Sequence, residues 1–220
     1  MLTLYHCVAA RSLRPLWMLE ELGLPYRLEM LPFPPRVERR EYLALNPLGT
    51  VPLLVDGDLR MTESAAICEY LAARHAPHAL QVSADEPGYA DYLNFLHFGE
   101  ATLTFPQTLL LRYGRFEPEA RRQPQVVEDY RRWFLARLRT LEPRLAASDH
   151  LACGRFTAAD VSVGYALMLA EYQDLQAALT PAVAAYWQRL RERPAYQRAL
   201  QAEQDAARAQ GIDATPSPLA

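Results

Sequence analysis

The chain has 220 residues, 50% of them hydrophobic, with a formal net charge of -3 and an isoelectric point near 6.0. This length and composition can bury a substantial core in one large domain or two small ones. The slightly acidic balance argues against a nucleic-acid partner, which a basic stripe would indicate. No apolar run approaches the roughly 20 residues of a membrane-spanning helix, so we expect no membrane partner.

Two residue types are informative because they are scarce. All 23 basic residues are arginine, and a chain without lysine excludes Schiff-base chemistry, lysine-bound pyridoxal phosphate and a phosphate-binding Walker loop. The cysteines Cys7, Cys68 and Cys153 are too few and too scattered for a disulfide framework or a zinc site. We therefore expect no metal, no bound cofactor, no secretion signal ahead of the first strand, and a cytoplasmic protein.

The first part of the chain alternates predicted strands and helices. Strand patterns cover residues 2–6, 26–30, 51–55 and 59–61, and helical patterns cover residues 13–22, 41–45 and 64–74. Gly23 and Pro25 end the first helix, and Asp56-Gly57 forms the turn between the last two strands. This β-α-β-α-β-β-α order is typical of a thioredoxin-like domain, which we place at residues 1–78.

The remainder of the chain is predicted to be helical. Turn residues at 79–88 indicate a linker, and residues 89–220 carry helical periodicity with breaks at 113–124, 148–156 and 179–181. We expect the tail from Gly211, which contains Pro216 and Pro218, to be frayed or to lie on the surface. The predicted fold class is therefore an α/β domain followed by an all-helical domain.

The most informative segment is Asn46-Pro47-Leu48-Gly49-Thr50-Val51-Pro52-Leu53-Leu54. Pro52 lies in an apolar strand pattern, although proline cannot donate to the hydrogen-bond ladder of a strand interior. A cis peptide between Val51 and Pro52 resolves this conflict, because it turns the chain back and leaves the Val51 N–H and C=O unpaired. Val51 can then pair with an extended peptide, as one more strand would.

A site for charged groups follows at Glu63 and Ser64, where the last predicted strand passes into a helix. The free N–H groups of a helix start attract a carboxylate, and an acidic side chain beside them attracts an ammonium group. The same pair is also typical of an ordinary helix start. Next to Val51 and Pro52 it suits a short peptide that carries both an α-carboxylate and an α-amino group, as glutathione does.

Together these segments resemble the cytosolic glutathione S-transferases. The resemblance rests on residues 46–54 and 63–64, on Leu4-Tyr5-His6 followed by Arg11-Ser12-Leu13-Arg14, on Leu19-Glu20-Glu21-Leu22-Gly23, and on Phe156-Thr157-Ala158-Ala159-Asp160-Val161. It covers most of the chain well and the C-terminal end weakly. It implies a transferase that joins glutathione, its co-substrate, to a small hydrophobic electrophile, forms a homodimer and serves detoxification.

The resemblance also implies a residue near the end of the first strand that holds the glutathione thiol as a thiolate. Tyr5, Cys7 and Ser12 compete for this role. Ser12 is the first choice, because a hydroxyl at a helix start can donate to a sulfur anion, but it also suits an ordinary N-cap. Tyr5 matches the tyrosine of the animal-type enzymes and is equally a candidate for core packing. Arg11 either stabilises the thiolate or a glutathione carboxylate, or is a solvated loop charge.

Cys7 predicts a different reaction, because a cysteine beside the thiol site forms a mixed disulfide with glutathione and favours thiol oxidoreductase or peroxidase chemistry. The alternative interpretation is a buried thiol that only packs. A third hypothesis is a noncatalytic member of the fold that binds a protein partner. The sequence leaves all three hypotheses open.

Three further residues are candidates for substrate binding. Arg39, in a charged run with Arg36 and Arg40, either binds the glycyl carboxylate of glutathione or belongs to a solvated face. Phe105 and Tyr113 are candidates for an electrophile pocket between the two domains, although aromatic residues at helical spacing are more often core.

Thr157 and Asp160 are predicted to be structural. A threonine hydroxyl and a carboxylate at this spacing satisfy free N–H groups at a helix start, with an expected effect of roughly 1 kcal/mol. We therefore assign them no catalytic role.

Overall fold

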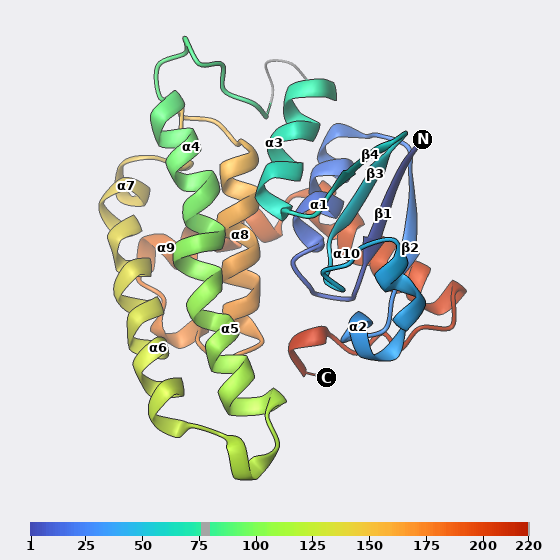
Figure 1. The fold of residues 1–220 in the computed structure, drawn as a ribbon. Helices are drawn as coiled ribbons and strands as arrows, with labels where there is room; N and C mark the ends of the chain where they lie inside the picture. The colour runs from blue at the N-terminus through green and yellow to red at the C-terminus, as the bar shows by residue number, and fades with distance from the viewer. Residues whose placement is uncertain (76–79, 220) are drawn as a thin grey trace. The chain divides into compact units, whose positions relative to one another are not determined.

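A four-stranded mixed β-sheet organises the first part of the chain in a computed structural model, which describes residues 1–75 and 80–219 (Figure 1). Its strands are β1 (Leu2–His6), β2 (Tyr26–Met30), β3 (Leu53–Asp56) and β4 (Leu59–Met61). They lie in the order β2-β1-β3-β4, with β1 parallel to β2 and antiparallel to β3, and β3 antiparallel to β4. The strand expected at 51–55 begins later, at Leu53.

The helices of this part follow the predicted order. They are α1 (Leu13–Leu22), α2 (Pro35–Glu38), the 3-10 helix η1 (Arg40–Ala44) and α3 (Ser64–His75). Helix α1 is almost entirely buried and packs against α3, and Gly23 ends it in the left-handed conformation with a φ of 60°. The thioredoxin-like fold class is confirmed; α2 is an additional short helix that the sequence analysis did not predict.

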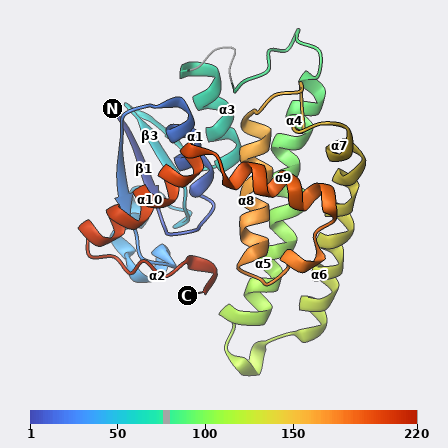
Figure 2. The ribbon, with the colours of Figure 1, turned by 180° about the vertical axis from the view of Figure 1, so that it is seen from behind.

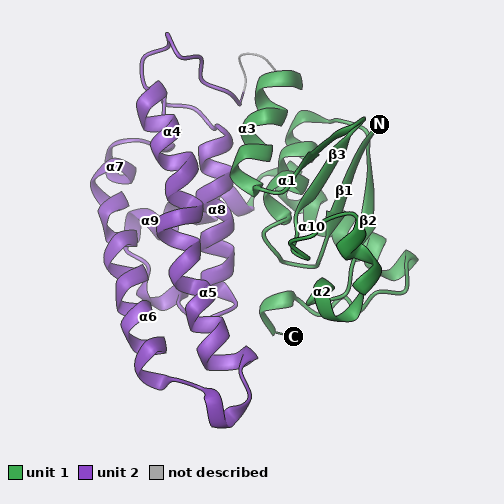
Figure 3. Cartoon of the chain, viewed as in Figure 1, with its two compact units in different colours: residues 1–77, 192–220 green, residues 78–191 purple. Residues whose placement is uncertain are grey.

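The C-terminal segment belongs with this sheet, not with the helical domain to which the sequence analysis assigned it. Residues 192–220 form one compact unit with residues 1–77, and residues 78–191 form the other (Figure 3). Helix α10 (Pro194–Ala209) packs against α1 and β2 (Figure 2), where the rings of Trp17 and Tyr196 meet edge to face. An apolar face on α10 therefore completes the core of the first unit.

The tail after α10 is tied to the same unit and is not frayed. The Gln210 amide group binds the free edge of β2, donating to the Leu28 carbonyl at 2.8 Å and accepting from the Met30 N–H at 2.9 Å. Ser217 is buried and donates to the Val8 carbonyl from both its N–H, at 2.9 Å, and its hydroxyl, at 2.6 Å. These contacts outweigh the tendency of a proline-containing chain end to fray.

The second unit is helical. Its longer helices are α4 (Tyr89–His97), the π-helix η2 (Phe98–Thr104), α5 (Phe105–Leu111), the π-helix η3 (Arg112–Phe116), α6 (Pro124–Leu138), α7 (Glu142–Ala147), α8 (Ala158–Glu171) and α9 (Pro181–Arg191). Residues 80–88 have turns and irregular backbone, and the predicted boundary at residues 78 and 79 lies outside the described residues. Within the two described ranges, no helix has both the length and the apolarity needed to cross a bilayer.

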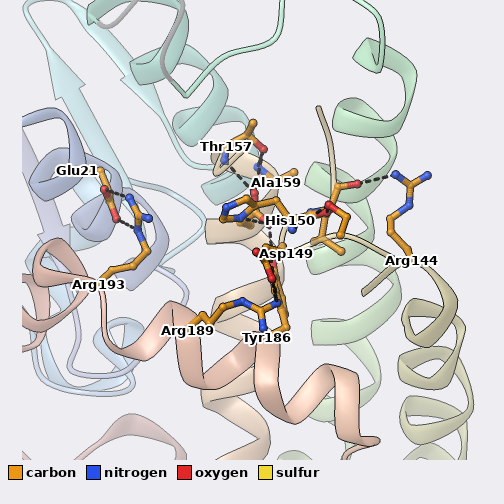
Figure 4. A network of polar contacts seen from close by, with 12 residues as sticks. Glu21, Arg144, Asp149, His150, Thr157, Ala159, Tyr186, Arg189 and Arg193 are labelled. Atoms are coloured by element: carbon orange, nitrogen blue, oxygen red, sulfur yellow. Dashed lines mark hydrogen bonds and ion pairs between the residues drawn. The ribbon is translucent and has the colours of Figure 1, made fainter. Parts of the chain in front are cut away.

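The predicted cap at the start of α8 is confirmed (Figure 4). Thr157 Oγ1 accepts from the Ala159 N–H at 3.3 Å, and the Asp160 carboxylate accepts from the Thr157 N–H at 2.8 Å. The same carboxylate accepts from the Leu151 N–H at 3.1 Å and from the Tyr186 hydroxyl at 2.8 Å. Burial raises the pKa of Asp160, and these donors partly oppose that rise. Asp160 is therefore a structural centre of the second unit.

Candidate functional site

The sheet register brings three of the predicted site segments to one edge. Strands β1 and β3 are antiparallel, with Tyr5 opposite Leu53, so the end of β1 lies beside the start of β3. Leu54 lies opposite Met61 in β4, so the chain enters β3 and leaves β4 at the same edge. The β1–α1 loop, the Val51-Pro52 segment and the start of α3 therefore converge there.

A closed turn before β3 explains the asparagine and the glycine of the sequence motif. Asn46 Nδ2 donates to the Thr50 carbonyl at 2.8 Å, and Asn46 Oδ1 accepts from the Leu48 N–H at 3.1 Å. Gly49 has a φ of 60°, and a Cβ added there would lie only 2.6 Å from the Cβ of Arg36. Only glycine fits this position without movement of its neighbours.

The peptide between Val51 and Pro52 is cis, as the sequence predicts. A second cis peptide joins Phe33 to Pro34 and was not predicted. The Val51 side chain packs against a buried apolar cluster that includes Tyr42. Within the described part of the chain, no group hydrogen-bonds to the N–H or C=O of Val51, so both remain available to a ligand strand.

The start of α3 combines an exposed acid with a buried hydrogen bond from a charged donor. The Glu63 side chain is exposed, whereas Ser64 is buried and its Oγ accepts from Arg14 Nη1 at 3.1 Å. Arg14 comes from α1 and is itself fully buried. Its positive charge adds to the partial positive charge of the helix start, where an anion is favoured.

Ser12 occupies a buried position in the β1–α1 loop. Its Oγ accepts from the Cys7 N–H at 3.4 Å. Ser12 stands at the predicted N-cap position of α1, but its side chain makes no capping hydrogen bond there. In the described residues, no group accepts the Ser12 hydroxyl hydrogen. The side chain therefore links the two ends of the loop, and its role in activating the thiol remains a prediction.

Cys7 is a packed thiol. It is fully buried, its Sγ lies 3.7 Å from the Pro32 carbonyl oxygen, and its cluster contains Ala10, Leu31, Tyr42 and Leu53. Burial raises the pKa of the Cys7 thiol from 9.0 to about 12. A redox cysteine requires the opposite, an accessible thiol with a lowered pKa, so this geometry disfavours the oxidoreductase hypothesis.

Tyr5 and Arg11 differ in their surroundings. Tyr5 is partly buried, and its ring lies 5.6 Å from the Tyr42 ring, between centroids, and packs against the Cys7 cluster. Arg11 is half-exposed at the end of the loop, directly before Ser12. Among the candidate thiol activators, Arg11 combines a permanent charge with accessible surface.

Of the remaining candidates, Arg39 lies in the first unit, and Phe105 and Tyr113 lie in the second. Arg39 Nε lies 3.3 Å from the Glu41 carboxylate. Phe105 is 53% exposed at the start of α5, and Tyr113 lies in η3 with the Arg112 guanidinium 5.8 Å from its ring centroid. An open hollow in the second unit excludes both aromatic residues and is lined by Leu93, Asn94, His97, Phe98, Ala101 and Thr102. The binding roles of Arg39, Phe105 and Tyr113 remain predictions.

Comparison with known proteins decides the family. A family model described as glutathione S-transferase, N-terminal domain, matches residues 10–74. Over 184 residues the chain is 30% identical to glutathione S-transferase 3 of Schizosaccharomyces pombe, which covers 78% of this chain and 75% of that protein. Over 189 residues it is 34% identical to glutathione S-transferase 4 of Zea mays, with 83% of each chain covered. The chain belongs to the glutathione S-transferase family.

The solved structures agree with this membership. A sphingomonad glutathione S-transferase complexed with glutathione superimposes with a TM-score of 0.79 and 26% identity, covering 92% of this chain and 98% of that one. The glutathione S-transferase likeness therefore extends well beyond the residues matched by the N-terminal family model.

The glutathione S-transferase motifs did not point to every residue that holds this site. His6 Nε2 lies 2.8 Å from Glu203 Oε2, although 197 residues separate the two positions. The available signal was an acidic residue on the apolar face of a helix, because Glu203 is buried on α10 together with Tyr196, Ala199 and Ala207. Within the described ranges, no group of three or more His, Cys, Asp or Glu is placed to hold a metal.

Proposed function

We propose that this family member conjugates the thiolate of glutathione to a small apolar electrophile. The observation that carries the proposal is the unpaired backbone of Val51 at the same sheet edge as the start of α3. A structural relative is complexed with glutathione, which supports the choice of ligand. Glutathione is a co-substrate here, and the proposal includes no cofactor or metal.

The tripeptide is extended along Val51 in this proposal. Its cysteinyl backbone exchanges hydrogen bonds with the Val51 N–H and C=O, as an added strand does. The γ-glutamyl carboxylate lies at the N–H groups that begin α3, near Ser64, and the ammonium group lies near Glu63. Arg39 is assigned to the glycyl carboxylate, and Phe105 and Tyr113 to the electrophile.

Arg11 is assigned to the sulfur. Lowering the pKa of a thiol from about 8.5 to about 6.5 corresponds to roughly 2.7 kcal/mol of preference for the thiolate. A single contact with a charged hydrogen-bond donor supplies about 1.5 to 3 kcal/mol, so one guanidinium is sufficient. Ser12 contributes by holding the loop through the Cys7 N–H, and Tyr5 and Cys7 contribute packing.

The chemical step is a displacement. The thiol proton leaves to solvent, the sulfur lone pair attacks the electrophilic carbon, and a C–S bond forms as the bond to the leaving group breaks. The leaving group departs with that electron pair, so no oxidant or reductant is required. The enzyme provides a held thiolate and an oriented ligand.

Three measurements on the purified chain test this function. They are calorimetric titration with glutathione, the ultraviolet absorbance of the bound thiolate as pH varies, and the rate of conjugation to an activated aryl chloride. We expect binding in the submillimolar to millimolar range and conjugation above the uncatalysed rate. No binding at millimolar glutathione would overturn both the transferase and the oxidoreductase hypotheses and leave the protein-binding module.

The assignment of Arg11 has its own test. Arg11→Ala is expected to lower kcat/KM at neutral pH by tenfold or more while glutathione affinity changes little, because Val51 and Glu63 still hold the ligand. Arg60→Ala, at an exposed arginine of β4, is the matched control and is expected to retain full activity. Unchanged conjugation by Arg11→Ala, together with lost conjugation by a folded Ser12→Ala, would transfer the role to Ser12.

We also propose that the protein is a cytoplasmic homodimer with a role in detoxification, as is typical of the family. Sedimentation at micromolar concentration tests the assembly. A single species of 25.0 kDa would contradict the dimer.

A further inference from the structure

The β1–α1 loop is held from the far end of the chain. Glu203 Oε2 accepts from the Ala9 N–H at 3.0 Å and from His6 Nε2 at 2.8 Å. Ser217 donates twice to the carbonyl of Val8, which directly precedes Ala9 in sequence. The end of β1 and two residues of the loop, Val8 and Ala9, are thus fastened to α10 and to the tail that follows it.

The loop has a backbone conformation that requires such support. Ala9 has a φ of 56°, in the left-handed region that residues other than glycine adopt at a cost. Its N–H points to Glu203, whose side chain is almost completely buried on α10. A buried carboxylate is stable only when donors satisfy it, so Glu203 and the loop fix each other in one arrangement.

His6 is the hydrogen-bond donor in its contact with Glu203. An ionised carboxylate only accepts, so Nε2 of His6 carries the hydrogen in its contact with Glu203. The other ring nitrogen, Nδ1, is buried and has no hydrogen-bond partner in the described part of the chain. The imidazole is therefore fully committed to Glu203 and contributes no second anchor elsewhere.

We propose that Glu203 is a positioning residue for thiol activation: by fixing Ala9 and His6 it sets where Arg11, two residues further along the loop, meets the glutathione sulfur. This inference rests on the proposed transferase function. Glu203 is buried beneath the loop and touches neither glutathione nor the electrophile. Without its anchor the loop has other conformations available, and fewer molecules present Arg11 to the sulfur.

The test compares Glu203→Ala with Glu203→Gln in the full chain. The alanine variant removes both hydrogen bonds, whereas the glutamine carbonyl can still accept from Ala9 and His6. We expect Glu203→Ala to raise the apparent pKa of the bound glutathione thiol by about one unit and to lower kcat/KM at neutral pH about tenfold, with glutathione affinity within about twofold. Glu203→Gln is expected to restore most of both quantities.

Asp205→Ala is the matched control, because Asp205 is an exposed carboxylate on the same helix, and its partners among the described residues are the surface groups Gln201 and Arg208. It is expected to leave the thiol titration unchanged. If Glu203→Ala does not fold, Glu203→Asp replaces it, since the shorter side chain keeps the charge and withdraws it from Ala9.

The outcomes separate this inference from the proposed function. A wild-type chain that neither binds nor ionises glutathione overturns both. A wild-type chain that ionises the thiol, with an identical titration in folded Glu203→Ala or Glu203→Asp, overturns the positioning role alone.

Discussion

Arg14 in α1 donates from Nη1 to the Ser64 hydroxyl at 3.1 Å, and both side chains are buried where α1 meets the first turn of α3. A buried guanidinium is costly unless hydrogen-bond acceptors surround it. The contact therefore fixes the first turn of α3 and adds positive charge at the place assigned to the γ-glutamyl carboxylate. One interaction serves stability and, in the proposed function, substrate binding.

Ser64→Ala tests this contact. Removing one acceptor of a buried charged donor is expected to lower the free energy of unfolding by about 1 to 3 kcal/mol and to weaken glutathione binding. Urea unfolding and calorimetric titration measure the two effects. Thr62→Ala is the control, since the Thr62 hydroxyl has no hydrogen bond within the described residues, and a change within about 0.5 kcal/mol is expected. Equal losses in the two variants would contradict a role for the Arg14 contact.

Alanine substitutions at two glycines distinguish the destabilisation caused by backbone conformation from the destabilisation caused by steric crowding. Gly49 and Gly57 both have a φ of 60°, but an added Cβ meets Arg36 at 2.6 Å and Leu43 at 2.8 Å only at Gly49. Gly57→Ala is expected to cost about 1 to 2 kcal/mol from the left-handed conformation alone. Gly49→Ala is expected to cost about 1 to 3 kcal/mol more than Gly57→Ala, because the Arg36 and Leu43 side chains must move.

Urea unfolding of both glycine variants measures the difference. Gly49→Ala is also expected to weaken glutathione binding, because the turn that it distorts precedes Val51. Similar stability of the two variants would show that the Arg36 and Leu43 side chains yield without cost.

The sequence predicted those features of the site that depend on residues close together in the chain. Gly23 and Asp56-Gly57 predict where α1 ends and where β3 turns into β4, and the position of Pro52 in an apolar run predicts the cis peptide before it. Residues 64–74 have a helical pattern, and α3 occupies Ser64–His75. Each of these features depends on neighbours within a few positions.

The parts that did not follow depend on distant contacts. The burial of Cys7 depends on how Tyr42 and Leu53 pack against it, which no periodicity in residues 7–12 records. The contact of Glu203 with His6 spans 197 positions, and it places the C-terminal segment in the first unit. The helical pattern after residues 179–181 did not separate α9 from α10, and it carried no information on the partner of α10.

The buried thiols predict a pattern of chemical modification. Burial raises the pKa of Cys7 and of Cys68 to about 12, although the charge of Arg14 partly opposes the rise at Cys68. At about pH 9 each thiol is then ionised in roughly one molecule in a thousand, so neither is expected to react with iodoacetamide in the folded protein. Cys153 is half-exposed and is expected to react.

Peptide mapping by mass spectrometry after alkylation measures the three sites, and alkylation in urea provides the control in which all three react. Faster modification of Cys7 than of Cys153 in the folded protein would restore the oxidoreductase hypothesis.

The same shift at Cys7 predicts how stability changes with pH. The unfolded thiol ionises near its ordinary pKa of 9.0, whereas the folded thiol keeps its proton up to about pH 12. The unfolded state therefore binds fewer protons above pH 9, and the free energy of unfolding falls as pH rises through this window. Between about pH 8 and about pH 10 the wild type is expected to lose about 1.4 kcal/mol more than Cys7→Ala in urea unfolding. Parallel curves would contradict the raised pKa.

Asp160 provides a prediction about stability without catalysis. One carboxylate oxygen accepts from Thr157 N–H and the other from Leu151 N–H and the Tyr186 hydroxyl, so an asparagine in either orientation turns an amide group toward a donor. Asp160→Asn is expected to lower the free energy of unfolding by about 3 kcal/mol, because a hydrogen bond to a charged acceptor is lost and a donor is left unsatisfied.

Thr157→Ser keeps the capping hydroxyl and is expected to cost less than about 1 kcal/mol. Conjugation per folded molecule should be unchanged in both variants, because the network lies in the start of α8 and holds no ligand group. If an Asp160 variant unfolded at the same urea concentration as the wild type but no longer catalysed conjugation, Asp160 would have a catalytic role.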